Sequence, residues 1–437
     1  MVDKNDFGIF LTKAIGKIGD RHAYISKYKL PNNKCFPFAF APYKNKVAVL
    51  KFDKASKEYS LFSSEYPFLK SIESNLITEL ISEILPEEIL APKDAYFTRA
   101  VRELREIEEI YGKLGKKLSN NIEIELTNDT HDLDTIVQVL LVNRNEKINK
   151  WDEQFYRKYF NLITEKEDYN LPHIYNQLFT FDDNIAYIHL PKMVDEDETP
   201  ELYKALNVFM QKDEISKSEA LIIDVRSNSG GGRGLIMELA SYIVHPDSIH
   251  IVNVAQQRGS LPLSDDYKED LNNRYLFSYD QIDEDEQAIV KQFNQSFKPM
   301  YELDSTKFSE FHYCILNGSK ISKKEHYYSN PIYVLANERT FSAASVLVAI
   351  FKDLPNVKIA GVNTDGSSGN SERFELPISK LRGRMSTMVS FQKNGQILDG
   401  FGTEPDIRIE RDLNQIFWKN DSQLKELKEI IEKTVPN

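Results

Sequence analysis

Residues 331–349 read PIYVLANERTFSAASVLVA, an apolar run, a turn of small residues and a second apolar run. The first run predicts a buried strand and the second a helix, so Ser342 lies at the corner between them. A serine at such a corner caps the helix when its oxygen accepts a backbone N–H. A nucleophile would also stand there, because the first N–H groups of a helix stabilise a developing oxyanion. Both interpretations stay open on this stretch alone.

A second apolar run, ALIIDVR (220–226), leads directly into SNSGGGRG (227–234). Three successive glycines free the backbone and its N–H groups near the carboxyl end of a buried strand, where ligands bind in α/β folds. The phosphate-binding patterns GK[ST] and GxGxxG are missing. The interpretation that remains is an oxyanion hole for a peptide carbonyl. In this interpretation, Gly230 and Gly231 would meet the Ser342 turn at the ends of neighbouring strands.

Strands and helices alternate from residue 184 onward, which predicts a mainly parallel sheet covered by helices. The acidic segment 278–293 indicates a solvated helix rather than a binding site. Before this core, the pattern predicts a linker and an edge helix, rather than core, over 146–180 and a β-rich module over about 43–145. The module's elements are strands within 36–62, helices within 67–85 and 96–115, and strands at 121–128 and 135–142, after a first helix at 7–19.

Composition excludes several function classes. The formal net charge is −12 and no long run of Lys or Arg occurs, which disfavours a nucleic-acid or anionic-membrane partner. No apolar stretch approaches the roughly 18 residues of a membrane span, and the charged first 24 residues predict neither a signal peptide nor a lipid anchor. Two cysteines without a CxxC pair and eight scattered histidines predict no disulfide framework, metal or cofactor.

Four motifs occur in the order and spacing of the tail-specific, or C-terminal processing, serine peptidases: LIIDVRSNSGGG, PIYVLANERTFSAASVLVA, IAGVNTDGSSG and GFGTEPDI. The chain resembles that family along nearly its whole length. The resemblance implies a crotonase/ClpP-like α/β core with Ser342 as the nucleophile. It also implies an oxyanion hole formed by the backbone N–H of Ala343 and by Gly230 and Gly231.

One departure from the family changes the expected base. The processing peptidases carry a catalytic lysine in G-x-x-T-x-G-K, and the matching GVNTDGS places Ser367 there. Imidazole is the usual substitute. With GDRHAYI before the β-rich module and LDGFGTEPDI near the C-terminus, the chain resembles the tricorn-type branch. This resemblance implies His22, within a D-x-H pattern, as the base and Asp399 as the carboxylate that orients it. Arg21 stands where that branch has a supporting serine.

Each candidate also has a structural interpretation. Taken alone, His22 is typical of a surface or capping histidine, and Asp399 beside Gly400 of a turn residue. His189, in the strand IAYIHLP, is assigned to the core. The resemblance favours the catalytic roles of His22 and Asp399.

The β-rich module resembles a PDZ-like domain through YPFLKSIESNLITELI (66–81), although the glycine-rich carboxylate-binding loop is not visible. The expected organisation is an N-terminal helical cap with the first part of the core (1–42), a PDZ-like domain (43–145) and a serine peptidase core (146–437). PDZ domains bind peptides as an added strand. The module is therefore expected to gate or orient substrates.

These observations predict a serine endopeptidase acting on unfolded or C-terminally exposed polypeptides, with no cofactor. The first alternative is a catalytically inactive protein of this fold that binds a peptide or lipid-like ligand. A second is an acyl-CoA-type enzyme with the same core, which the PDZ-like module and the GFGTEPDI ending disfavour. By resemblance the location is periplasmic or extracellular.

Overall fold

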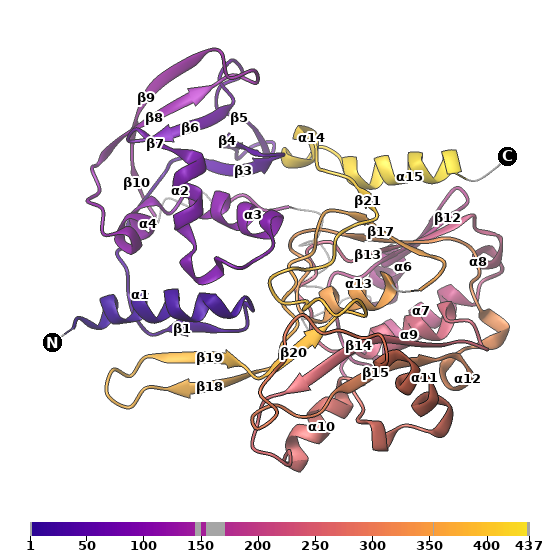
Figure 1. Cartoon of the computed structure of the whole chain (residues 1–437). Helices are drawn as coiled ribbons and strands as arrows, with labels where there is room; N and C mark the ends of the chain where they lie inside the picture. The colour runs from indigo at the N-terminus through magenta and orange to yellow at the C-terminus, as the bar shows by residue number, and fades with distance from the viewer. Residues whose placement is uncertain (1, 145–149, 154–170, 353, 435–437) are drawn as a thin grey trace. The chain divides into compact units, whose positions relative to one another are not determined.

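The structure is a computed structural model that describes residues 2–144, 150–153, 171–352 and 354–434 (Figure 1). It divides the chain into two compact units. Unit 1 comprises Met1–Phe155, Arg373–Met385 and Glu410–Glu426, and unit 2 comprises Tyr156–Glu372, Ser386–Ile409 and Leu427–Asn437. No helix within the described ranges is long and apolar enough to cross a bilayer.

The core of unit 2 is a six-stranded sheet in the order β11-β12-β13-β16-β17-β21. All neighbours from β12 to β21 run parallel, and β11 lies antiparallel at one edge. Every residue of β13 and β16 is buried, as expected for parallel strands covered on both faces. The strands are β11 (Phe179–Asp182), β12 (Ile185–His189), β13 (Ala220–Asp224), β16 (Ile332–Ala336), β17 (Val357–Gly361) and β21 (Ile407–Arg408).

Helices of unit 2 pack into one apolar core with this sheet. In α7 the buried residues recur at helical spacing, whereas α13 is buried all round from Ala343 to Phe351, as befits a helix inside the core. The helices are α6 (Leu171–Leu178), α7 (Pro200–Met210), α8 (Asp213–Lys217), α9 (Gly234–Ile243), α12 (Gly318–Ile321) and α13 (Ala343–Lys352). The expected linker falls largely outside the described residues. Helix α6 lies within the expected edge-helix region, but its Tyr175 and Leu178 are buried in the apolar core, so the prediction that this region lies outside the core is wrong in part.

A second, antiparallel sheet of unit 2 has the order β15-β14-β20. Its strands are β14 (Ile249–Gln257), β15 (His312–Asn317) and β20 (Met388–Phe391), with helices α10 (Asp265–Asn273) and α11 (Glu284–Asn294) between β14 and β15. The acidic segment forms α11, which starts with a capping box between Asp283 and Glu286 and is mostly exposed. It is a solvated helix, as predicted.

Unit 1 contains a seven-stranded antiparallel sheet with the path β3-β4-β6-β8-β9, to which β5 and β7 add. The strands are β3 (Ala39–Tyr43), β4 (Lys46–Asp53), β5 (Glu58–Leu61), β6 (Phe68–Ile72), β7 (Asn75–Leu76), β8 (Asn121–Thr127) and β9 (Asp134–Leu140). The helices α2 (Ile77–Ile84), α3 (Lys93–Glu103) and α4 (Ile107–Leu114) contribute to its apolar core. The short strands β2 (Lys34–Cys35) and β10 (Val142–Asn143) pair with each other.

The predictions of helices within 67–85 and 96–115 are both wrong in part. Residues 68–76 form the hairpin β6–β7, whose turn places Glu73 at φ 47° and Ser74 at φ 60°. Such a two-residue turn normally carries Asn or Gly, so the usual hairpin signal is missing. The helix expected at 96–115 is broken between α3 and α4, where Arg105 and Glu106 are buried as an ion pair.

The N-terminal segment is built against a hairpin from far along the chain. After α1 (Lys4–Ile15) and a 3₁₀ turn (Gly16–Ile18), strand β1 (Tyr24–Ser26) pairs with β19 (Arg382–Ser386), which lies beside β18 (Ser371–Glu375). The unit also includes α14 (Leu413–Ile416), whose Ile416 carbonyl accepts a bond from the buried Trp151 indole at 2.9 Å, before α15 (Ser422–Thr434). The expected boundaries at residues 42/43 and 145/146 stay predictions.

Candidate active site

Ser342 occupies the turn between β16 and α13, as predicted, in an unusual backbone conformation. Its φ of 54° lies in the left-handed region, where a non-glycine residue costs about 1–3 kcal/mol and where functional residues are concentrated. The side chain is half-buried. Ala343 is the first residue of α13, so its N–H belongs to the first turn, which has no partner within the helix.

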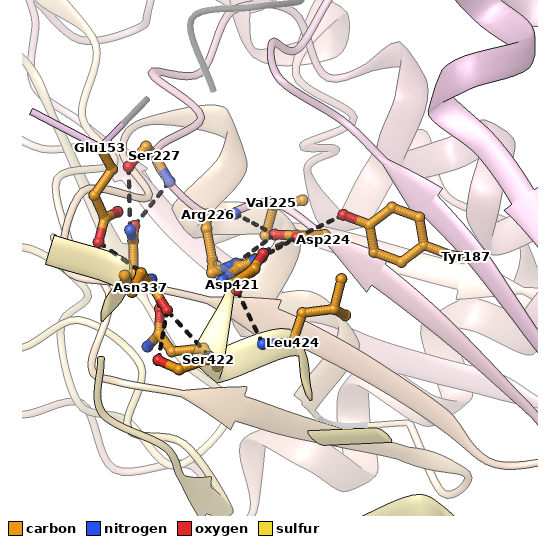
Figure 2. A network of polar contacts seen from close by, with 12 residues as sticks. Glu153, Tyr187, Asp224, Val225, Arg226, Ser227, Asn337, Asp421, Ser422 and Leu424 are labelled. Atoms are coloured by element: carbon orange, nitrogen blue, oxygen red, sulfur yellow. Dashed lines mark hydrogen bonds and ion pairs between the residues drawn. The ribbon is translucent and has the colours of Figure 1, made fainter. Parts of the chain in front are cut away.

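Two buried side chains hold this turn against the end of β13. Asn337 accepts a hydrogen bond from the Ser227 N–H at 2.8 Å, and its amide donates to the Ser227 hydroxyl at 3.1 Å (Figure 2). The Thr340 hydroxyl donates to the Val225 carbonyl at 2.9 Å. Both residues are fully buried, so these bonds fix the Ser342 turn relative to the glycine loop.

The glycine loop approaches the turn at Gly230. A Cβ on Gly230 would lie 2.5 Å from the Ser342 Cβ and 2.9 Å from the Ala343 nitrogen, so only glycine leaves space there. The buried Asn228 fixes this approach: its carbonyl accepts the Phe341 N–H at 2.9 Å, and its side-chain oxygen accepts the Gly230 N–H at 2.9 Å. The structure thus brings Ser342, Ala343 and Gly230 together, with the Gly230 N–H already donated.

Gly231 lies against the chain that follows β12. It forms an isolated parallel bridge with Met193, and a Cβ there would lie only 1.9 Å from the Met193 carbonyl oxygen. Its φ of 143° is accessible mainly to glycine. The loop is therefore fixed on both sides, at Gly230 by the Ser342 turn and at Gly231 by Met193.

A buried ion pair stabilises the end of β13 just before this loop. The Asp224 carboxylate accepts bonds from the Arg226 guanidinium at 2.7 and 3.0 Å and from the Tyr187 hydroxyl at 2.8 Å (Figure 2). Burial acts to raise the pKa of Asp224, but Arg226 outweighs it and holds that pKa below its ordinary value. His189 is buried on β12 in register with Asp224.

The segment in the position of the family lysine lies along the first turn of α13. The Asp365 N–H donates to the Thr340 carbonyl at 3.0 Å, and the Gly366 N–H to the Ser345 hydroxyl at 3.3 Å. Ser367, which replaces the lysine, is buried and donates its hydroxyl proton to the Asp365 carboxylate at 2.8 Å. Position 367 therefore offers a hydroxyl bound to a carboxylate instead of an amine.

Asp399 is buried beside the same segment. Its carboxylate accepts a bond from the Ser368 N–H at 2.7 Å and one from the Ser368 hydroxyl at 3.1 Å. Within unit 2, Asp399 thus anchors the loop next to α13. Among the described residues, no group of three or more His, Cys, Asp or Glu side chains is arranged to hold a metal ion.

His22 belongs to unit 1, in the turn before β1. Its ring Nδ1 lies 2.7 Å from a carboxylate oxygen of Asp20, and the same oxygen accepts the His22 backbone N–H at 2.9 Å. Arg21, in the place of the supporting serine, lies 3.6 Å from the Glu88 carboxylate. His22 and Ser342 lie in different units, so their meeting stays a prediction.

Sequence reasoning missed several residues that shape this site. The side chains of Asn228, Asn337 and Thr340 bond to backbone groups that are distant in sequence, namely the Leu190 carbonyl, the Ser227 N–H and the Val225 carbonyl. No local sequence pattern reports such bonds. Asp20 was within reach, because it stands two residues before His22 in the D-x-H pattern that pointed to the histidine.

Solved structures support the fold. Mature CPAF has a TM-score of 0.60 with 16% identity, covering 98% of this chain and 87% of that chain. Mature CPAF complexed with lactacystin has a TM-score of 0.59 with 15% identity, covering 98% and 88%. At these identities the likeness shows the fold alone.

Curated relatives match only a short region. An uncharacterized protein of Chlamydia muridarum is 26% identical over 113 residues, which is 25% of this chain and 19% of the relative. A protein of Chlamydia trachomatis is 28% identical over 113 residues, with the same coverage. The match therefore spans about a fifth of the length of these curated relatives.

The profile of peptidase family S41 matches residues 184–409, just over half of the chain. The matched range contains the Ser342 turn, the glycine loop and Asp399. With the similar folds, this match confirms the predicted α/β fold class and, at the level of the family, the prediction of a serine-type peptidase. The chain therefore belongs to peptidase family S41.

Proposed function

We propose that the chain is a serine endopeptidase that hydrolyses peptide bonds through an acyl-enzyme on Ser342, with His22 as the general base. The observation that carries the proposal is the backbone of Ser342, held at φ 54° at the start of a buried helix and directly against Gly230. A helix cap needs no such strain, since capping residues normally have extended backbone. The strained backbone of Ser342 is held in place by bonds of the buried Asn228 and Asn337. Backbone strain of this kind is typical of a functional site.

In the proposed reaction, the Ser342 Oγ attacks the peptide carbonyl while its proton passes to His22 Nε2. The Ala343 N–H stabilises the resulting oxyanion. We assign the second oxyanion donor to the Gly231 N–H, because the Gly230 N–H is donated to Asn228. His22 then protonates the leaving amine, and a water molecule hydrolyses the acyl-enzyme by the reverse proton path.

The environment of Ser367 supports a base other than the family lysine. A serine hydroxyl does not accept a proton at neutral pH, and this one donates to Asp365. An imidazole has the basicity for the step. The role that the resemblance implies for Asp399, orienting His22, is kept as a prediction and is tested below beside a second carboxylate.

We propose unfolded or C-terminally exposed polypeptides as substrates, met in the periplasm or outside the cell. The net charge of −12 disfavours nucleic acid as a partner. The β-rich sheet of unit 1 is the part that would orient a polypeptide, in the manner of PDZ-like domains.

The test compares wild type, Ser342→Ala and His22→Ala in casein hydrolysis and in labelling by a fluorescent phosphonate. Ser264→Ala is the matched control, because Ser264 caps α10 by accepting the Tyr267 N–H. We expect labelling at Ser342 in the wild type and in Ser264→Ala but not in the two site variants, and casein turnover reduced at least about 100-fold in both site variants.

If Ser342 is only a cap, Ser342→Ala will behave like Ser264→Ala, with about 1 kcal/mol less stability and no loss of activity. If the wild type neither labels nor hydrolyses casein, the peptidase proposal is wrong, and a peptide-binding protein of this fold becomes the better interpretation.

A further inference from the structure

We propose that Asp20 is the positioning residue that orients His22 for proton transfer. This inference rests on the proposed function, in which His22 is the base. It starts from the 2.7 Å distance between an Asp20 carboxylate oxygen and His22 Nδ1, which is the length of a charge-assisted hydrogen bond.

The same carboxylate oxygen holds both the backbone and the ring of His22. It accepts the His22 N–H at 2.9 Å in addition to the contact with Nδ1. The Asp20 side chain is only 1% exposed and that of His22 is 16% exposed, so water competes weakly for this carboxylate. Because one buried carboxylate oxygen accepts the backbone N–H and also contacts the ring Nδ1, the imidazole has little rotational freedom.

The backbone on either side of the pair is fixed as well. Before it, Gly19 takes φ 80° and ends the 3₁₀ turn. After it, the Ala23 N–H donates to the Asp20 carbonyl at 3.0 Å, and β1 pairs with β19. Ala23 and Ile25 are buried in a cluster with Leu381, so the orientation of the pair is built into the packing of unit 1.

The arrangement determines which ring nitrogen reacts. A carboxylate accepts only, so Asp20 selects the tautomer with the proton on Nδ1 and leaves the lone pair on Nε2. When Nε2 takes the Ser342 proton, the ring becomes an imidazolium that the ionised Asp20 stabilises, and Asp20 itself takes no proton. Asp399, in contrast, accepts bonds from the Ser368 N–H and hydroxyl within unit 2.

The kinetic test compares Asp20→Asn with Asp399→Asn, with Asp3→Asn as the matched control. Asp3 is an exposed carboxylate that caps α1 in the same N-terminal segment, and Asn is an equally good cap. We expect Asp20→Asn to lower kcat by about 10³–10⁴-fold with little change in KM, because the carboxamide favours the wrong tautomer. A loss of that size in Asp399→Asn, with Asp20→Asn within tenfold of wild type, overturns the proposal.

A second readout does not depend on turnover. In protein labelled with ¹⁵N-histidine and carrying Ser342→Ala, the neutral His22 ring is expected to be protonated at Nδ1, and Asp20→Asn is expected to move the proton to Nε2. His22→Ala identifies the signal among the eight histidines. An Nε2-protonated ring in the presence of Asp20 overturns the inference. If the wild type hydrolyses nothing, the kinetic comparison refutes the proposed function, while the ¹⁵N shifts alone decide the role of Asp20.

Discussion

Replacing Gly230 with alanine tests the geometry of the site most directly. The added Cβ would lie 2.5 Å from the Ser342 Cβ, 2.8 Å from the Phe341 carbonyl oxygen and 2.9 Å from the Ala343 nitrogen. All three atoms belong to the Ser342 turn, which buried asparagine and threonine side chains hold in place. The methyl group therefore displaces either the glycine loop or the Ser342 turn.

The size of the effect follows from these distances. An ordinary carbon contact needs roughly 3.5 Å, so the Ser342 turn or the loop must move by about 1 Å. A displacement of that size costs on the order of 10²-fold in rate, and loss of an oxyanion donor costs about 10²–10³-fold. The backbone at φ 85° adds only about 1–2 kcal/mol of strain. We expect a folded protein with kcat reduced at least about 100-fold.

The assay is the rate of phosphonate labelling at Ser342 together with casein turnover and thermal unfolding. Gly115→Ala is the control, because Gly115 also has a positive φ, of 66°, but a Cβ there meets nothing within 4 Å. It should show the backbone strain without the loss of activity. A folded Gly230→Ala protein that labels within threefold of the wild-type rate would refute the reasoning that the close approach of Gly230 to Ser342 is needed for the proposed nucleophile to react.

Three further predictions concern the surroundings of the site. Asp224→Asn leaves Arg226 buried without its carboxylate, so denaturant unfolding should show a loss of about 3–5 kcal/mol that the exposed Asp247→Asn does not share. Because Arg226 keeps the pKa of Asp224 low, this loss should persist from neutral pH down to the unfolded-state pKa of about 3.9 and shrink between that pH and the lower folded-state pKa; a loss that vanishes by pH 5 contradicts the assignment. Burial raises the pKa of Cys314 to about 11, so only about one thiol in 10³ is ionised at pH 8. Mass spectrometry should find Cys314 unalkylated by iodoacetamide in the native protein and alkylated after unfolding; equal rates in both states would be incompatible with that burial. Thr340→Val removes the bond to the Val225 carbonyl and the acceptor of the Asn337 N–H, which should cost about 1–3 kcal/mol and slow Ser342 labelling; unchanged labelling would show that the turn does not need this clamp.

The parallel core was predictable because its strands are continuously apolar. The run 220–226 and the run 331–336 became β13 and β16, and the apolar segment after Ser342 became α13. A strand that is buried on both faces of its sheet needs apolar residues at nearly every position, so the apolar runs in the sequence match the strands of the structure. The same agreement placed the Ser342 turn and the Gly230 loop at neighbouring strand ends.

The β-rich module was harder because tertiary contacts decide its conformation. Residues 67–76 lack a turn signal, yet Glu73 and Ser74 adopt positive φ because β6 pairs with both β7 and β8. The break between α3 and α4 surrounds the buried pair Arg105 and Glu106, which resembles an ordinary solvated stretch in sequence. Strand pairing between distant residues and the burial of a charged pair produce no local hydrophobic periodicity, so neither feature could be predicted from the sequence pattern.

The missing lysine and the N-terminal histidine are connected through one stretch of chain. In the processing peptidases the segment after the nucleophile carries the base itself. Here that segment carries Ser367 and continues, from Ser371, into the hairpin β18–β19, on which β1 forms the third strand. His22 stands two residues before β1 and is held by Asp20, so the strand pairing of β19 fixes the segment that bears the proposed base. If His22 is the base, the carboxylate in contact with its ring is the candidate for orienting it, and within unit 1 that carboxylate is Asp20, 2.7 Å from His22 Nδ1.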